Sequence, residues 1–472
     1  MHEHARAFAA RRKFLAGMAG LAAVPLPSMR SGAHAASEPA LVQASLVAAT
    51  ASAQLVPAPR PSTEVWAYDG QVPGPMLRLR QGDRLRVQVT NHLDQDTTVH
   101  WHGIRLPNAM DGVPNLTQPP IGPGGTFVYE FTLPDAGTFF YHPHVRGYEQ
   151  VSRGLAGALI VEEREPIQVD REQVWVLGDW RLNRDASIRG GFGKFMDVSH
   201  NGRVGNTVTI NGKVADTFRV RAGERIRLRL INAASARIFA LEFRGHRPMV
   251  IALDGQPVEP HAPEGGAVIL APAQRADVVI DMLDAPGSRH PIQDRFYAGL
   301  EYQLVELGYA DEPPLRAKPL AASIRLPANR LAEPDLARAE RHEIAFSGGM
   351  QGNMGGMSPG KAWALNGVSK GCGDSVAVFD PLLILRLGRS YVLRLVNDTA
   401  WHHPMHWHGH SFRVILRDGR PTTHREWLDT VLLAPRESAE IAFVADNPGE
   451  WMFHCHVLDH QAGGMAACLR VT

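Results

Sequence analysis

Histidines gather in four short clusters along the chain, and each cluster holds a His-x-His pair. The pairs are His100 and His102, His142 and His144, His406 and His408, and His454 and His456. Residues i and i+2 of a strand point to the same face, so each pair would present two imidazoles side by side. Neutral imidazole is the commonest metal ligand in proteins. Eight imidazoles therefore predict a cluster of about two or three metal ions, since one ion takes only about four ligands; ordinary structural histidines are the alternative.

A cysteine in the last cluster indicates which metal is bound. Cys455 lies between His454 and His456, so its thiolate should point to the opposite strand face and belong to a separate site. The candidate partners for this thiolate are His403, His460 and Met465. Two histidines, one cysteine and a weak methionine ligand form a blue-copper electron-transfer site, whereas zinc prefers four firm ligands and has no role for a thioether. An electron that reaches Cys455 would then leave through its own backbone to either neighbouring histidine.

Strands must hold these clusters, and a repeated pattern predicts where the strands lie. Three segments share an apolar-Arg pair, a glycine, and alternating residues up to an asparagine nine positions after the glycine; they are 79–91, 220–232 and 385–397. Period-two alternation predicts half-buried strands, and each glycine predicts a turn. The copies lie too far apart for a solenoid, so they mark whole domains. Short alternating strands with Pro/Gly turns predict all-β sandwiches or barrels.

The repeats divide the chain into three predicted domains. We expect the first at 37–164, the second at 165–312, a Pro-rich linker at 313–334, and the third at 335–472. The first and third domains hold two histidine clusters each. The second holds only scattered histidines, which are His200, His246, His261 and His290.

The first residues of the chain indicate export. Basic residues at 11–13 precede an apolar run from Phe14 to Leu26, and a small-residue cleavage site follows at 33–35. This order predicts a signal peptide over residues 1–36, and the paired Arg11 and Arg12 are typical of the twin-arginine type. The run is too short to span a bilayer. We therefore expect a periplasmic or secreted protein with no membrane span after cleavage.

Composition excludes some classes of partner. Hydrophobic residues make up 44% of the chain and charged residues 21%, which is ordinary for a soluble globular protein, and the formal net charge of +1 gives no sign of the basic face that nucleic-acid binding needs. Three cysteines are too few for a disulfide scaffold. Cys372 and Cys468 could pair in an oxidising compartment, or they could remain two buried thiols.

The four clusters, their order and the three repeated domains resemble the multicopper oxidase family, in particular its three-domain bacterial laccase and cuprous oxidase types. The resemblance covers essentially the whole mature chain. It implies three cupredoxin-like Greek-key β-barrel domains and an enzyme with four copper ions. Such an enzyme couples four one-electron oxidations of a reducing substrate, either a phenolic or other aromatic donor or Cu(I), to the reduction of O₂ to water. A copper-free binding or scaffolding protein of the same fold is the alternative.

The resemblance also implies how the ligands are shared. The type 1 copper would take His403, Cys455, His460 and Met465. The type 2 copper would take His100 and His406. One type 3 copper would take His102, His142 and His456, and the other would take His144, His408 and His454. The trinuclear centre would then lie between the first and third domains, with the second domain as a spacer. His410, which flanks the third cluster, is expected to support the ligands or to be structural.

Oxygen reduction consumes protons, so an acid is expected near the trinuclear centre. Asp111 stands where the family has such an acid; a turn aspartate before Gly112 is the alternative. Several bacterial relatives carry glutamate just after the last type 1 histidine, but this chain has Gln461 there, which cannot hand over a proton. Asp111 would then work alone, or with another acid such as Asp459, or turnover would be slower.

A glycine-rich stretch near the third domain contains three methionines, Met350, Met354 and Met357. The glycines oppose a stable helix, and a flexible loop of soft thioethers suits Cu(I). The stretch resembles, in shortened form, the Met-rich segments of bacterial cuprous oxidases and predicts a site for substrate copper; a plain flexible loop is the alternative. Methionine at axial position 465 indicates a low-to-middle potential and easily oxidised donors.

Overall fold

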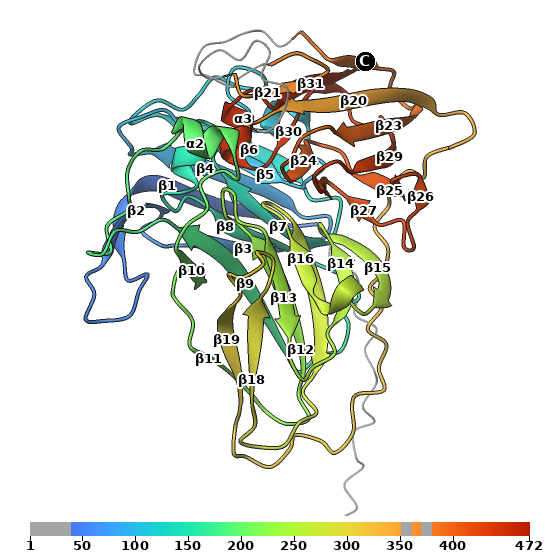
Figure 1. Ribbon diagram of the computed structural model, residues 1–472. Coiled ribbons are helices and arrows are strands. Elements are labelled where there is room, and N and C mark those ends of the chain that lie inside the picture. Colours follow the sequence, from blue (N-terminus) through green and yellow to red (C-terminus); the bar gives the residue numbers. More distant parts are fainter. Residues whose placement is uncertain (1–38, 351–360, 370–379) are drawn as a thin grey trace, which may run out of the picture. The chain divides into compact units, whose positions relative to one another are not determined.

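The computed structural model describes residues 39–350, 361–369 and 380–472. In these residues thirty-one strands form six sheets, and only three short α-helices and two 3-10 turns accompany them. The sheets fall into three pairs in chain order, which Figure 1 shows in blue to cyan, green to yellow, and orange to red. The predicted all-β class is confirmed. The predicted signal peptide lies outside the described residues.

The first pair of sheets uses β1 to β8. One sheet has the order β2-β1-β4-β6, with β2 Thr63–Tyr68, β1 Leu41–Ala53, β4 Arg84–Asn91 and β6 Thr126–Thr132. The other has the order β3-β8-β7-β5, with β3 Gly74–Arg80, β8 Gly157–Glu162, β7 Gly137–His142 and β5 His100–His102. The short η1 (Asn108–Met110) and α1 (Gly147–Gln150) follow β5 and β7.

The second pair uses β9 to β19. Its first sheet has the order β10-β9-β12-β17-β14-β15, with β10 Thr207–Ile210, β9 Arg171–Trp180, β12 Arg225–Asn232, β17 Arg275–Asp281, β14 Met249–Leu253 and β15 Gln256–His261. Its second sheet has the order β11-β19-β18-β13-β16, with β11 Thr217–Val220, β19 Tyr302–Tyr309, β18 Arg289–Asp294, β13 Phe239–Phe243 and β16 Val268–Leu270. Helix α2 (Phe195–Ser199) and turn η2 (Glu264–Gly266) belong to this stretch.

The third pair uses β20 to β31. One sheet has the order β21-β20-β23-β29-β25-β26 with β27 on β25; the strands are β21 Trp363–Leu365, β20 Glu340–Gly348, β23 Ser390–Asn397, β29 Ser438–Val444, β25 Phe412–Arg417, β26 Arg420–Pro421 and β27 Trp427–Leu428. The other has the order β22-β31-β30-β24-β28, with β22 Leu383–Leu385, β31 Ala466–Val471, β30 Gly449–Cys455, β24 His403–Trp407 and β28 Thr430–Leu433. Helix α3 (Leu458–Ala462) joins β30 to β31.

The repeated sequence pattern becomes a repeated strand. β4, β12 and β23 each lie parallel to the first strand of their pair, namely β1, β9 and β20. Each also lies antiparallel to a later strand, namely β6, β17 and β29. The same connectivity therefore recurs three times, as the pattern predicts.

The asparagine that ends each repeat closes the same turn. Asn91, Asn232 and Asn397 are buried, and the Oδ1 atom of each accepts the backbone N–H of the residue two positions later, at 2.9, 3.0 and 3.1 Å. The Nδ2 atom of each donates to two backbone carbonyls. A buried amide must be satisfied in this way, so the side chain fixes the path of the chain after the strand.

The second copy of the repeat differs from the predicted half-buried strand. β4 alternates between exposed and buried residues, but every residue of β12 is buried, including its arginines. Arg227 forms ion pairs with Glu163 and Asp277, and Arg229 also reaches Asp277. Burying these guanidinium groups is tolerated because each is paired. The polar face of β12 therefore packs against protein, so the prediction of a solvated face was wrong here.

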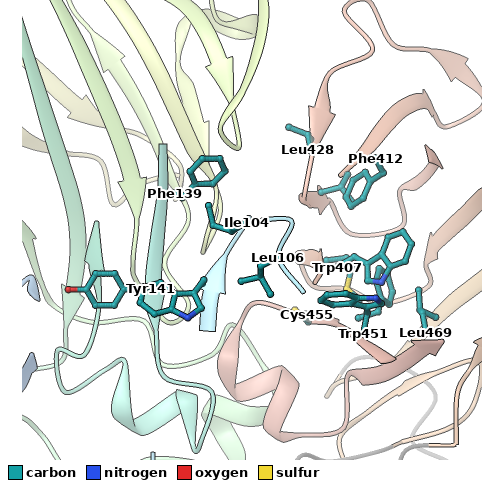
Figure 2. Close-up of a cluster of buried hydrophobic side chains, with 14 of the residues drawn as sticks. Ile104, Leu106, Phe139, Tyr141, Trp407, Phe412, Leu428, Trp451, Cys455 and Leu469 are labelled. Atoms are coloured by element: carbon teal, nitrogen blue, oxygen red, sulfur yellow. The ribbon is translucent and has the colours of Figure 1, made fainter. Parts of the chain in front are cut away.

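The hydrophobic core runs without interruption from the first pair of sheets to the third. One buried cluster contains side chains of both pairs, and Cys455 is part of it. Figure 2 shows Cys455 close to Trp407 and Trp451, with Leu106 of the first pair nearby. The second pair has a core of its own, centred on β12, β17 and β19. This packing removes water from the region where the histidine clusters meet.

Three further sequence expectations concern the linker, a possible disulfide and membrane spans. The described residues between β19 and β20, which include the predicted linker, contain no strand or helix. Cys468 is buried on β31, whereas its possible disulfide partner Cys372 lies outside the described residues. No helix in the described part of the chain has the length and apolar character to cross a membrane.

Candidate metal centres

Two pairs of adjacent strands carry the four histidine clusters. β5 lies antiparallel to β7 with His100 opposite His142, and β24 lies antiparallel to β30 with His406 opposite His454. His144, His408 and His456 follow directly after these strands. The strand register therefore sets the histidine pairs of each sheet side by side, and the two sheets bring their pairs together.

Two groups of three histidines match the sets implied for the type 3 ions. His102, His142 and His456 have ring nitrogens within 4.8 Å of one another, and so do those of His144, His408 and His454. The Nε2 atoms of His456 and His142 lie 3.3 Å apart, and those of His408 and His454 lie 3.1 Å apart. Each group takes histidines from both the first and the third pairs of sheets.

A third group joins the two histidines implied for the type 2 ion. His100 and His406 lie with His102 in one group of ring nitrogens within 4.8 Å. The rings of His102 and His406 stack with centroids 3.7 Å apart, and those of His100 and His408 with centroids 3.8 Å apart. The eight imidazoles therefore form one continuous cluster.

The cysteine belongs to a separate group, as its position on the strand predicts. The Cys455 Sγ atom lies 3.6 Å from Nδ1 of His403 and 3.6 Å from Nδ1 of His460, and these two nitrogens lie 3.2 Å apart. Met465 is fully buried, and its carbonyl accepts the backbone N–H of Cys455. The flanking His454 and His456 point instead into the histidine cluster, so β30 serves both sites from its two faces.

Burial determines the charge of these groups. It lowers the pKa of nearly all the clustered histidines, to about 3 for His460, and neighbouring imidazoles lower most of them further. These imidazoles are therefore neutral at ordinary pH, which is the state that binds metal. Burial also raises the pKa of the Cys455 thiol, so a thiolate there needs a nearby cation.

Protein oxygens fix one nitrogen of most of the imidazoles. The Nδ1–H groups of His142, His406 and His454 donate to backbone carbonyls at 2.9 to 3.0 Å. Nε2–H of His403 donates to Thr399 Oγ1 at 2.9 Å, and that of His460 to the carbonyl of His200. Such contacts select the tautomer and aim the other nitrogen at a metal.

The remaining nitrogens fit metal ions. Two imidazole nitrogens bound to one ion at about 2.0 Å each lie about 3.3 Å apart at a tetrahedral angle, and a thiolate and an imidazole lie about 3.5 Å apart. The distances within the groups agree with these values. Within the described residues, the buried Nε2 atoms of His100, His144 and His406 have no hydrogen-bond partner. Unpaired buried polar atoms are rare in native proteins, and imidazole with thiolate and thioether suits copper.

Asp111 lies where the sequence predicts an acid. It is buried, its Oδ2 accepts the Nδ1–H of His408 at 2.8 Å, and its backbone carbonyl accepts the Nδ1–H of His100 at 2.8 Å. Asp111 is thus tied to two of the predicted ligands, which a plain turn residue would not be.

The other candidate side chains near the ligands face elsewhere. Asp459 is buried and accepts the backbone N–H of Arg203 in the second pair of sheets; burial raises its pKa to about 6. Gln461 is buried with Nε2 4.0 Å from Met452 Sδ. His410 stacks on Trp407 with centroids 4.1 Å apart, and burial lowers its pKa to about 3. His410 therefore has a structural position.

One of the three predicted loop methionines is described. Met350 is exposed, and its backbone N–H donates to the carbonyl of Ser199 at the end of α2. The same short helix carries the exposed Met196 and leads to His200, whose carbonyl covers Nε2 of His460. Met354 and Met357 lie outside the described residues. The thioethers of Met196 and Met350 therefore lie on two segments next to the cysteine site.

Asp429 is a functional candidate that the sequence analysis missed. It is buried between β27 and β28, its Oδ1 accepts the Nε2–H of His102 at 3.2 Å, and its carbonyl accepts the Nδ1–H of His406 at 2.9 Å. No local motif marks it, because a single aspartate after Leu428 has no spacing signature.

Comparisons with known proteins agree with the site. Multicopper oxidase family models match residues 49–166, 171–301 and 356–472. Multicopper oxidase MmcO of Mycobacterium tuberculosis is 33% identical, over 96% of this chain and 93% of that protein. Copper resistance protein A of Pseudomonas syringae pv. tomato is 28% identical, over 86% of this chain and 89% of that protein.

Solved structures show the same fold. The crystal structure of a multi-copper oxidase from Pseudomonas thermotolerans has a TM-score of 0.83 at 36% identity, over 92% of this chain and 100% of that one. A multicopper oxidase from Campylobacter jejuni, described as a metallo-oxidase, has a TM-score of 0.77 at 27% identity, over 91% of each chain. The chain therefore belongs to the multicopper oxidase family, copper enzymes that couple the oxidation of a substrate to the reduction of O₂.

Proposed function

We propose that the chain holds four copper ions, in the arrangement implied by its motifs. The proposed type 1 ligands are His403, Cys455, His460 and Met465. The proposed ligands of the trinuclear centre are His100 and His406 for type 2, and His102, His142, His456, His144, His408 and His454 for type 3. The support is the three groups of buried histidine nitrogens, two of which share His102, together with one separate group that contains a thiol. When bound, the coppers supply one-electron transfer and the four-electron reduction of O₂ to water.

The chain itself links the two proposed sites. Cys455 contacts His403 and His460 through its side chain, while its covalent neighbours His454 and His456 belong to the histidine cluster. An electron that leaves Cys455 can therefore reach the histidine cluster through covalent bonds alone, either to the preceding residue, His454, or to the following residue, His456. Burial of the whole path excludes water from it.

We assign proton delivery to Asp111. Its carboxylate can hold a proton at Oδ1, which lies 3.2 Å from Nδ1 of His100, while Oδ2 stays bonded to His408. Gln461 cannot replace it, and Asp459 accepts the N–H of Arg203 instead.

Asp111→Asn keeps the size of the side chain but removes the acid. We expect anaerobic reduction of the blue site by the donor to continue, while O₂ uptake falls at least about tenfold; normal O₂ uptake would remove Asp111 from this role.

Cu(I) is the donor that the surroundings of His460 favour. The outward nitrogen of His460 donates to the carbonyl of His200, and His460 is fully buried, so an organic ring has no direct contact with it. The exposed thioethers of Met196 and Met350 lie on the covering segment and its neighbour, and thioethers bind Cu(I). The metallo-oxidase and copper-resistance names of relatives agree with this choice.

Oxygen uptake with Cu(I) and with a phenol tests the donor. The double variant Met196→Leu/Met350→Leu should lower turnover of Cu(I) severalfold and leave turnover of the phenol unchanged. Met76→Leu is the matched control, because Met76 on β3 is 50% exposed, between Met350 at 38% and Met196 at 60%. If Cu(I) turnover is unchanged in the double variant, and the protein oxidises the phenol faster than it oxidises Cu(I), the protein is a laccase instead.

The proposed location of this activity is outside the cytoplasm. The support is the order of basic, apolar and small residues over 1–36, with the paired Arg11 and Arg12 of a twin-arginine signal. Oxidation of Cu(I) in the periplasm would serve copper homeostasis. A fusion of residues 1–36 to a reporter protein tests export, and replacing both arginines by lysine should abolish it.

A further inference from the structure

Asp429 determines which nitrogen of His102 faces the histidine cluster. Nε2–H of His102 faces Asp429 Oδ1 at 3.2 Å and, at 3.3 Å, the hydroxyl oxygen of Thr430, which itself donates to that carboxylate. The Nδ1 atom of His102 is therefore the one that lies 3.5 Å from Nε2 of His142. Asp429 also fixes His406, because its backbone carbonyl accepts the Nδ1–H of that ring. A carboxylate behind a ligand imidazole fixes its tautomer and orientation. The position of Asp429 therefore matters to two proposed ligands at once.

Asp429 does not hold this position alone. Arg275, from β17 of the second pair of sheets, donates Nη1–H to Oδ1 at 2.9 Å and Nη2–H to Oδ2 at 2.5 Å. The guanidinium is fully buried, and its Nε–H donates to the carbonyl of Thr138 on β7. A two-pronged pairing of this kind allows the carboxylate one orientation only. One arginine thus joins β17 to β7 and to the segment that carries Asp429.

A second residue of the middle pair holds the backbone of the same segment. Asp254, in the turn between β14 and β15, accepts the backbone N–H groups of Asp429 and Thr430 through Oδ2, at 3.3 and 3.0 Å. Its Oδ1 accepts the backbone N–H of Arg275 at 3.0 Å. Both the side chain and the main chain of Asp429 are therefore held by the second pair of sheets.

The first pair of sheets leaves room for this arrangement. Gly103 follows His102 directly, and a Cβ atom there would collide with Nη2 of Arg275 and lie 2.6 Å from Oδ2 of Asp429. The His-Gly step after the first histidine cluster therefore admits the ion pair without displacement, which a residue with a side chain would not.

We propose that Arg275 is a positioning residue for the trinuclear copper centre, acting through Asp429 on His102 and His406. The middle pair of sheets is then part of the site rather than a spacer, although it supplies none of the proposed ligands. This inference rests on the proposed function, because it needs copper at the histidine cluster. It adds that the geometry of the trinuclear centre depends on an arginine whose side-chain hydrogen bonds, among the described residues, go to Asp429 and to the backbone carbonyls of Thr138 and Ala273 rather than to a proposed ligand.

Arg275→Lys tests the proposal in the full-length, copper-loaded protein. Lysine keeps the charge but cannot make the two-pronged pairing. We expect the variant to keep the visible absorption of the type 1 site, to show an altered electron paramagnetic resonance spectrum of the type 2 copper, and to bind that copper about tenfold or more weakly on titration with a chelator. Arg227→Lys is the matched control: Arg227 is equally buried on the adjacent β12, and its ion pairs run to Glu163 and Asp277.

The outcomes are distinct. A type 2 spectrum and affinity equal to those of the wild type in Arg275→Lys would overturn the positioning role, and so would an equal change in Arg227→Lys, which would mean that any buried arginine has this effect. If Arg275→Lys does not fold, Asp429→Asn removes the same ion pair from its other end and must give the same selective loss. A wild-type protein with neither a blue absorption nor a type 2 spectrum at full copper loading would overturn the proposed function itself.

Discussion

Gly103 offers a direct test of the packing around the Arg275–Asp429 ion pair. Its φ of 85° lies in the left-handed region, and Gly103→Ala would place a Cβ atom against both members of the pair. The alanine can be accommodated only if the ion pair separates or the backbone after His102 moves. Either response should destabilise the fold and disturb the histidine cluster.

The size of the expected loss of stability in Gly103→Ala can be estimated by comparison with a second glycine that also has a positive φ. Gly388, in the turn before β23, has a φ of 76°, and a Cβ atom added there would meet no other atom within 4 Å, so Gly388→Ala carries only the backbone penalty of about 1 kcal/mol. Gly103→Ala carries the same penalty and in addition disrupts a buried ion pair, which typically costs about 3–5 kcal/mol. We therefore expect the two variants to differ by roughly 3 kcal/mol in the free energy of unfolding.

Urea unfolding of the copper-free proteins measures this difference. Copper-free protein is the correct material, because bound metal would add its own contribution to the stability. Gly103→Ala should also bind less copper at the type 2 site, whereas Gly388→Ala should bind a full complement. Equal destabilisation of the two variants would refute the reasoning that Gly103 makes room for the ion pair.

Three more changes have definite expected outcomes. Asn397→Ala leaves two buried carbonyls and an N–H without their partner and should lower the free energy of unfolding by about 2–4 kcal/mol, measured by urea unfolding; a loss under about 1 kcal/mol would mean that the turn forms without the side chain. Cys455→Ser should abolish the intense visible absorption of the blue site but leave the copper of the histidine cluster in place; a retained blue band would exclude Cys455 as its ligand. Burial and then Asp429 raise the pKa of Asp254 to about 7, so its protonated form stabilises the fold at low pH and this contribution is lost as the pH rises through about 7. In Asp254→Asn the urea midpoint of the copper-free protein should therefore fall less between about pH 5 and about pH 8 than in the wild type, and an unchanged slope would contradict that assignment.

The histidine groups could be predicted because ligand spacing and strand period coincide. A His-x-His pair has a fixed meaning on any strand, and Cys455 between two such histidines must face the other way. The repeated strand that ends in Asn91, Asn232 and Asn397 could be predicted for the same reason, because its pattern recurs in sequence. In the structure the three asparagines make the same turn. These features depend on neighbours in sequence, which is the information that a single chain contains.

The features that escaped prediction depend on neighbours in space. Asp254, Arg275 and Asp429 come from a turn, a strand and a connection in two different pairs of sheets, and each is a lone charged residue in its own segment. The burial of β12 escaped for a similar reason. Alternation shows that its two faces differ, but it does not show whether the polar face meets water or the carboxylates of Glu163 and Asp277.

The buried charges explain what the middle pair of sheets contributes to a site whose proposed ligands all lie elsewhere. Without Arg275, Asp429 would be an unpaired carboxylate in a region closed to water, and such a group takes up a proton or moves toward solvent. A protonated Asp429 would be a weaker acceptor for the Nε2–H of His102. Either nitrogen of that ring could then turn toward His142. The proposed electron route through Cys455 needs only the third pair of sheets, but a single orientation of His102 needs the second pair as well. The two requirements meet at β24, where His403 serves the cysteine site and His406 serves the cluster that Asp429 holds in place.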